Sequence, residues 1–76
     1  MLSVRLEWLA VEVLDELPSD EARAAVQGLL VDVARRPEWW PQPGGEEVAE
    51  VFGALCWVSI VAYLDGVEVR DVGWAG

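Results

Sequence analysis

The spacing of apolar residues changes at Leu9, and this change constrains the fold more than any other feature of the chain. Over residues 2–8 apolar and polar side chains alternate, and the apolar ones are Leu2, Val4, Leu6 and Trp8. A period of two is typical of a strand with one buried face. From Leu9 the apolar residues recur at helical spacing, as Leu9, Ala10, Val13, Leu14 and Leu17. The sequence therefore predicts a strand over residues 2–8 and then a short helix that Pro18 ends.

Signals for a second helix follow directly. Ser19 is a good N-cap residue, and Asp20 and Glu21 then occupy the first turn, where the helix dipole favours negative charge. The stripe expected to face the core consists of Ala22, Ala25, Val26, Leu29, Leu30 and Val33. Pro37 ends this pattern, so the two helices are predicted to form a hairpin.

The second half of the chain predicts three strands. A loop rich in proline and glycine over residues 37–45 precedes a predicted strand over residues 47–52. Residues 55–64 are almost wholly apolar, which is typical of a central strand covered on much of both faces. A last strand is predicted over residues 67–72.

The Asp65-Gly66 pair between the last two strands predicts a type I′ hairpin turn. With these two residues in the turn, Tyr63 lies opposite Glu68 and Val61 opposite Arg70. The predicted fold is therefore α+β, in the order β-α-α-β-β-β, with an antiparallel sheet packed on a two-helix hairpin. A length of 76 residues fits a single small domain over residues 1–76.

The charge and residue types restrict the chemistry that this domain can perform. Fourteen acidic residues face five arginines, there is no lysine or histidine, and the formal net charge is −9. Nucleic-acid affinity depends on cations that neutralise phosphates, so direct nucleic-acid binding is not expected. Without histidine the commonest general base and metal ligand is missing, and we expect no cofactor and no metal.

The remaining composition suggests a protein of the cytoplasm. The single cysteine, Cys56, cannot form an internal disulfide and lies in an apolar run, where a buried, inert thiol is expected. No apolar run approaches the ~20 residues of a membrane span. The N-terminus lacks the basic and then apolar pattern of a signal peptide. We therefore expect no membrane partner.

The order of elements resembles that of the RelE/ParE superfamily of small toxins from bacterial toxin–antitoxin modules. The resemblance is carried by the opening strand Val4-Arg5-Leu6-Glu7-Trp8, the helix break Leu17-Pro18-Ser19, the helix end Ala34-Arg35-Arg36-Pro37 and the closing run from Val67 to Trp74. In RelE-like members, basic residues on the sheet, often with a tyrosine or histidine, cleave mRNA on the ribosome. ParE-like members instead act on gyrase through a protein surface.

The resemblance implies three candidate catalytic residues in this chain, Arg70, Tyr63 and Arg5. RelE-like active sets contain several lysines or arginines, whereas the predicted sheet here is rich in acids, namely Glu7, Glu47, Glu50, Glu68 and Asp71. We therefore expect no nuclease activity and assign no catalytic residue.

The tryptophans and acidic residues are the candidates for binding a partner. Trp8 and Trp57 lie in apolar strand contexts and are expected in the core. Trp39 and Trp40 lie in the proline-rich loop, where they either close the core or anchor a partner, and Trp74 has the same two interpretations. The acids Glu46, Glu47 and Glu50 lie after this loop and either keep the domain soluble or attract a basic partner.

These observations lead to three functional hypotheses. The first is a RelE/ParE-like domain that acts by protein binding in a toxin–antitoxin module, with the cognate antitoxin or another protein as partner. The second is an acidic inhibitor, for instance from a phage or mobile element, that blocks a basic surface by mimicking nucleic acid. The third is a nuclease with a reduced active site. A homodimer could use the same aromatic residues.

Overall fold

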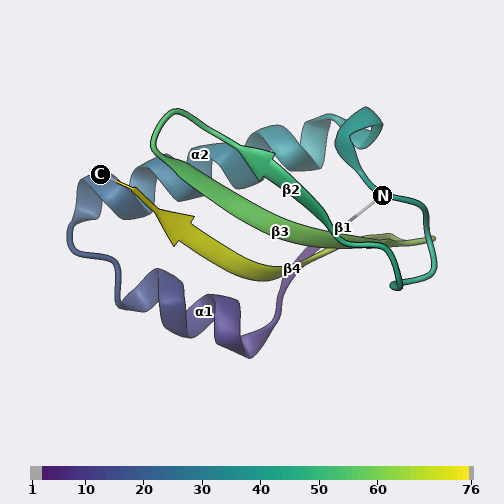
Figure 1. The fold of residues 1–76 in the computed structure, drawn as a ribbon, viewed down its shortest axis with the longest axis horizontal. Helices are drawn as coiled ribbons and strands as arrows, with labels where there is room; N and C mark the ends of the chain where they lie inside the picture. The colour runs from purple at the N-terminus through teal and green to yellow at the C-terminus, as the bar shows by residue number, and fades with distance from the viewer. Residues whose placement is uncertain (1–2, 76) are drawn as a thin grey trace.

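The computed structural model describes residues 3–75, and these form two helices and a four-stranded sheet (Figure 1). The strands are β1 (Ser3–Leu6), β2 (Ala49–Phe52), β3 (Cys56–Tyr63) and β4 (Gly66–Trp74). The helices are α1 (Trp8–Asp15) and α2 (Asp20–Arg35), and a single 3-10 turn, η1 (Pro37–Trp39), follows α2. The predicted α+β class is confirmed. Leu2, which the alternation assigned to the first strand, lies outside the described residues.

The sheet is mixed, so the prediction of an antiparallel sheet was wrong. The strand order is β1-β4-β3-β2, and β1 pairs with β4 in parallel, whereas the other neighbours are antiparallel. The direction follows from the helix hairpin. Helix α2 carries the chain back to the end of the sheet at which β1 begins (Figure 1). Strand β2 therefore runs in the direction of β1, and so does β4 after two hairpin turns.

The β3–β4 hairpin turns one residue earlier than predicted. Tyr63 pairs with Gly66 and Val61 with Glu68, so that Leu64 and Asp65 form the turn. The predicted pairs of Tyr63 with Glu68 and Val61 with Arg70 were wrong by two residues. A shift of two leaves every side chain on the same face of the sheet, so the apolar pattern does not distinguish the two registers.

The core lies between one face of the sheet and both helices. Helix α2 contributes residues spaced by four, three and four positions, which places them on a single side of the helix. Its Ser19 cap accepts a hydrogen bond from the Ala22 N–H at 3.1 Å, which fixes where the helix begins. The buried cluster consists of Ala10, Leu17, Ala22, Val26, Leu29, Val33, Cys56, Val58, Ile60, Val67, Val69 and Val72.

The opposite face of the sheet is called here the open face, because both described helices contribute to the core on the other side. It carries the alternate residues of β2 and β3, among them Phe52, Trp57 and Tyr63. The expectation that residues 55–64 are covered on much of both faces holds in part: Val61 on the open face is fully buried, whereas Trp57, Ser59 and Tyr63 on the same face are half-buried. Trp57 is only half-buried on the open face, and Trp8 is 65% exposed at the start of α1, so neither lies in the core as predicted.

Trp8 is exposed because β1 is shorter than its alternating pattern. The strand ends at Leu6 and α1 begins at Trp8, so the ring follows the rotation of the helix and no longer the pleat of the strand. Among residues 3–75, no helix has the length and apolar character needed to cross a membrane.

Candidate functional site

Three residues from three strands meet on the open face. The guanidinium carbon of Arg5 on β1 lies 5.2 Å from the centre of the Tyr63 ring at the end of β3. From β4, Arg70 Nη2 donates to the Tyr63 hydroxyl at 3.4 Å. The structure thus brings together all three candidates that the family resemblance implied, and we call them the arginine–tyrosine cluster.

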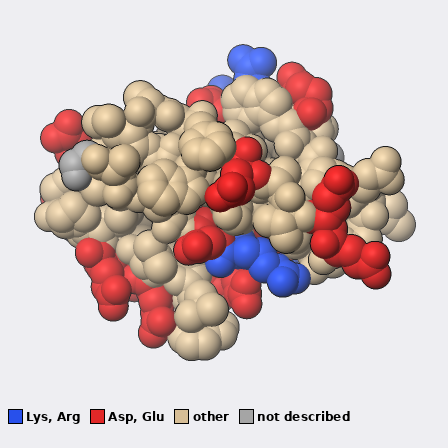
Figure 2. Space-filling view, viewed as in Figure 1, with Lys and Arg blue, Asp and Glu red and all other residues tan. Residues whose placement is uncertain are grey.

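Carboxylates surround this cluster. Arg70 Nε lies 3.1 Å from Glu68 Oε1 and 3.8 Å from Glu7 Oε2, and an Arg5 nitrogen lies 3.6 Å from the Asp65 carboxylate. Two cations therefore face three acids. Arginine side chains on the face shown in Figure 2 likewise lie among acidic ones. The cluster offers an approaching phosphate no excess of positive charge.

The charge of Arg70 is fixed by its neighbours. The hydrogen bond with the Tyr63 hydroxyl, and then the one with Glu68, raise the pKa of the guanidinium above its already high ordinary value. Arg70 therefore cannot serve as a proton donor or acceptor at any physiological pH. Its donors are directed at protein groups, which is the arrangement of an exposed ion-pair network.

The loop over residues 41–48, which carries Glu46 and Glu47, is attached beside Tyr63. The amides of Gly44 and Gly45 both donate to the Ala62 carbonyl at 3.0 Å. A β-carbon on Gly45 would lie 2.6 Å from the Tyr63 ring, so only glycine allows the loop to pass this close. Gly45 also has a φ of +77°, which other residues rarely adopt. The loop therefore holds the next residues, Glu46 and Glu47, near the open face.

The predicted partner-binding acids are all exposed, but they differ in what holds them. The Glu47 carboxylate accepts a hydrogen bond from the backbone N–H of Gln42 at 2.9 Å, which orders the loop. Glu50 lies on β2 between Ala49 and Val51, which pack against the core, and so it is on the open face. Glu46 lies on the loop, exposed to solvent.

The adjacent tryptophans have opposite environments. Trp40 packs against the core, and its indole N–H donates to the Val33 carbonyl at 2.7 Å, near the end of α2. Trp39 is 38% exposed, and the Arg36 guanidinium lies 5.2 Å from its ring centre. Trp74 also packs against the core. Of the three predicted anchors, Trp39 is therefore the one that the structure leaves facing outward.

An aromatic pair on the open face was missed by the sequence reasoning. Phe52 on β2 pairs with Trp57 on β3, and Phe52 is 68% exposed. Trp57 in turn lies over Gly73, its partner on β4, where a β-carbon would come within 2.0 Å of the ring. The signal was present in residues 49–52, where Glu50 and Phe52 alternate with apolar residues. It was misread because residues 55–64 suggested a strand without an open face.

The part of the chain that the structure describes has no group of three or more acidic, cysteine or histidine side chains that could hold a metal ion. In the comparisons with known proteins, no family model, no curated protein and no solved structure matches the chain.

Proposed function

We propose that this chain is a RelE/ParE-like domain that acts by binding another protein, as part of a toxin–antitoxin type module, and that it does not cleave RNA. The observation that carries the proposal is the pairing of Arg70 and Arg5 with carboxylates in the arginine–tyrosine cluster. Cleavage of a phosphodiester needs cations directed at the charge that develops in the transition state. Here those cations are already directed at Glu7, Glu68 and Asp65.

The electrostatics of the rest of the surface favour a basic protein partner. Two further arginines, Arg23 and Arg36, lie within 4.0 Å of Asp20 and Glu38, so that four of the five arginines are paired. With a net charge of −9, the domain speeds its encounter with cationic surfaces and repels phosphate backbones.

The binding surface that we propose joins Trp39 to the acids Glu46, Glu47 and Glu50, with Phe52 next to Glu50 on the open face. Tryptophan is enriched at the energetic centres of protein interfaces. The hydrogen bonds that hold the loop to Ala62, and the one within the loop from Gln42 to Glu47, lower the entropy that binding would otherwise cost. Acids beside such an anchor raise the association rate more than the affinity.

A second candidate is the acidic inhibitor that blocks a nucleic-acid-binding surface. It is favoured by the same excess of exposed carboxylates, which can stand in for phosphates on a basic protein. The two proposals differ in the partner. A captured protein that nucleic acid displaces supports the inhibitor, whereas one that nucleic acid does not displace supports the toxin–antitoxin reading.

The test is capture of a partner from host lysate at low and high salt, with the partner identified by mass spectrometry. We expect Trp39→Ala and the triple change Glu46→Gln, Glu47→Gln, Glu50→Gln each to reduce capture. The matched control is Glu12→Gln, Asp15→Asn, Glu16→Gln, which removes the same charge from α1 and its end and should leave capture intact. A folded protein that captures nothing, or capture that survives both surface variants, would refute the proposed surface.

A further inference from the structure

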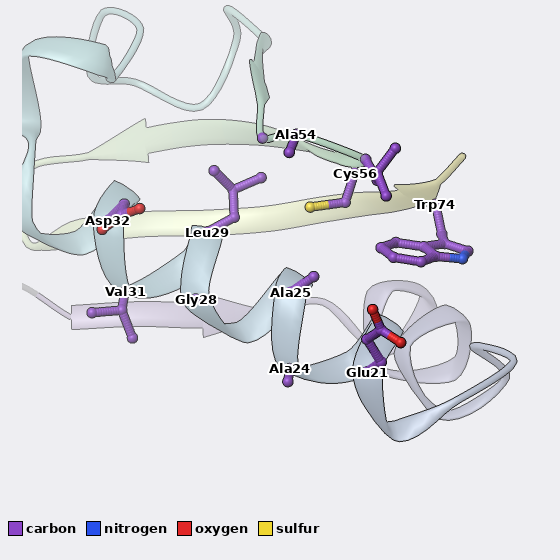
Figure 3. A pocket seen from close by; sticks show the side chains of 12 residues that line it. Glu21, Ala24, Ala25, Gly28, Leu29, Val31, Asp32, Ala54, Cys56 and Trp74 are labelled. Carbon is purple, nitrogen blue, oxygen red and sulfur yellow. The ribbon is translucent and has the colours of Figure 1, made fainter. Parts of the chain in front are cut away.

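An open groove of about 630 Å³ lies between α2 and the β2–β3 turn (Figure 3). Its walls come from the exposed side of α2, from the turn and from the C-terminal end of β4. Trp74 stands at one end, and the Cys56 sulfur lies beside Leu29 on the floor (Figure 3). Neither Trp39 nor the acids Glu46, Glu47 and Glu50 of the proposed surface line this groove.

The floor of the groove is apolar, and its helical wall is shallow. Leu29 and Cys56 are core residues whose outer atoms line the groove, and Ala24 and Ala25 lie on the wall. At Gly28 a β-carbon would have no heavy atom within 4 Å. A glycine inside a helix costs roughly 1 kcal/mol relative to alanine, and nothing within the described chain requires one here.

Two carboxylates lie at the ends of this apolar strip. Glu21 and Asp32 both line the groove and both are exposed. Eleven positions separate them on α2, which is about three turns or roughly 16 Å along the helix axis. Figure 3 shows Glu21 near the Trp74 end and Asp32 toward the other end of the groove.

We propose that this groove docks an amphipathic helix of a partner protein that carries an arginine or lysine at each end of its apolar face. The small side chains around Gly28 let a helix approach at the short end of the 8–10 Å range of interaxial distances. Cations three turns apart on the partner would then meet Glu21 and Asp32. This inference rests on the proposed function and names the chemistry of the partner.

The charges select this occupant over a second copy of the chain. Two copies docked through their grooves would bring both pairs of Glu21 and Asp32 into one interface. Like charges placed together in this way cost affinity and reject a partner. A cationic helix turns the same carboxylates into attractive contacts.

The probe for a direct test is a fluorescein-labelled synthetic helical peptide with an alanine and leucine face and arginines three turns apart. A matched peptide has glutamates at the two arginine positions. Fluorescence anisotropy with the full chain measures binding. We expect the arginine peptide to bind and the glutamate peptide not to bind. Failure of the arginine peptide to bind the folded wild-type chain would contradict the inference.

Variants separate groove binding from general attraction to an acidic protein. Glu21→Gln with Asp32→Asn should weaken peptide binding by roughly 2- to 30-fold, the range for two exposed ion pairs. The control Glu12→Gln with Asp15→Asn removes the same charge on α1 and should have no such effect. Equal weakening by both pairs would show non-specific binding and overturn the inference.

Filling the groove gives a second measurement. Gly28→Gln and Gly28→Trp place a side chain where a partner helix would lie, and each should abolish binding while the circular dichroism spectrum stays native. Gly28→Gln keeps the test valid if the tryptophan variant does not fold. Peptide binding unchanged in a folded Gly28 variant would refute the site. A wild-type dimer that a Gly28 variant converts to monomer would identify a second copy as the occupant.

Failure of the groove inference and failure of the proposed function would give different results. If the lysate partner is lost with the Trp39 and Glu46/Glu47/Glu50 variants but the groove variants have no effect on it or on the peptide, protein binding stands and the groove inference fails. If the groove variants lose both lysate capture and peptide binding, and the Trp39 and Glu46/Glu47/Glu50 variants lose neither, the partner binds in the groove.

Discussion

Trp39 and Trp40 are neighbours in the chain, yet one ring faces solvent and the other closes the core. The difference follows from η1, which turns the backbone directly after α2, so that Trp40 reaches back to the Val33 carbonyl. That carbonyl lies in the last turn of α2, where it also accepts from the Arg36 N–H at 3.3 Å, and the residue four positions on, Pro37, has no N–H to donate. The indole therefore caps the helix and covers the core at once.

Replacing the two rings separately should reveal this division. Trp40→Phe removes the 2.7 Å hydrogen bond to Val33 and part of the buried ring, and should cost about 1–2 kcal/mol of unfolding free energy. Trp39→Phe should change stability by less than about 0.5 kcal/mol, because Trp39 makes no such bond among the described residues. Urea unfolding measures both. Equal losses would contradict the assignment of Trp40 as the lid.

Replacing Gly73 or Gly28 with alanine should change the stability of the fold in opposite directions. A β-carbon at Gly73 would lie within 2.0 Å of the Trp57 ring, so Gly73→Ala should displace the ring at a cost of about 1–3 kcal/mol. Gly28→Ala meets no atom within 4 Å and should stabilise the fold by about 0.5–1 kcal/mol. Thermal or urea unfolding decides the signs.

A double-mutant cycle identifies the cause of the Gly73 effect. In a Trp57→Ala background the three atoms nearest to the added methyl group, all from the Trp57 ring, are absent, so most of the cost of Gly73→Ala should be lost. Gly73 has no positive φ, and backbone strain is therefore not an alternative cause. A cost that persists without the Trp57 ring would show that the packing of the ring on the sheet is not what requires glycine.

Cys56 lowers the free energy of unfolding at alkaline pH. Burial raises the pKa of this thiol above its ordinary 9.0, against a smaller opposite effect from a backbone hydrogen bond at Leu55. Above pH 9 the unfolded chain therefore loses the thiol proton before the folded chain does, and stability falls as the pH rises. Urea unfolding of wild type and Cys56→Ala from neutral to alkaline pH should show a shallower decline in the variant. Parallel declines would contradict this.

At the scale of elements, the start and core-facing side of α2 were readable from the sequence, whereas the start of α1 and the organisation of the sheet were not. The Ser19 cap and the four-three-four spacing of α2 are local signals, and the structure has both. The direction of β1 depends on how the helix hairpin returns the chain, and the register of β3 on β4 depends on the turn at Leu64 and Asp65. The alternation of apolar residues is the same for parallel and antiparallel strands, and it is the same for two registers that differ by two residues. The sequence pattern therefore carried no information on the direction of β1 or on the register of β3 and β4.

The candidate site shows the same contrast between local and non-local information. The family resemblance named Arg5, Tyr63 and Arg70, and the structure brings them together. Glu68 is two residues from Arg70 on β4, so this pair is local, whereas Glu7 and Asp65 come from other segments and no local pattern predicts their approach to Arg70 and Arg5. The inward turn of Trp40 was likewise undetermined, because it depends on the tight turn of η1.

Two adjacent leucines on α2 test which side of this helix faces the core. Leu29 is 6% exposed and lies within the buried cluster, whereas Leu30 is half-buried at its edge. Leu29→Ala should cost about 2–5 kcal/mol, and Leu30→Ala should cost about 1 kcal/mol. Urea unfolding of the two variants measures the difference. A larger loss for Leu30→Ala would place the core on the other side of α2.

For the whole molecule, charge is the property that most favours the proposal of protein binding over RNA cleavage. The fold places arginines and a tyrosine on one open face, as the resemblance implies for an RNA-cleaving member. It also places acids within 4.0 Å of both arginines. A sheet face that carries aromatic residues, and three carboxylates around two arginines, offers a polyanion no attraction and favours the proposal of a protein partner.

The central claim is that the domain acts through protein contacts and not through RNA cleavage. The most direct measurement is mRNA integrity in a ribosome-containing translation assay supplied with purified wild type, Arg70→Ala and Tyr63→Phe. We expect intact mRNA in all three reactions, at protein concentrations at which a RelE-type nuclease control cleaves. Cleavage by the wild type that is lost in Arg70→Ala or Tyr63→Phe would contradict the claim and make the arginine–tyrosine cluster an active site.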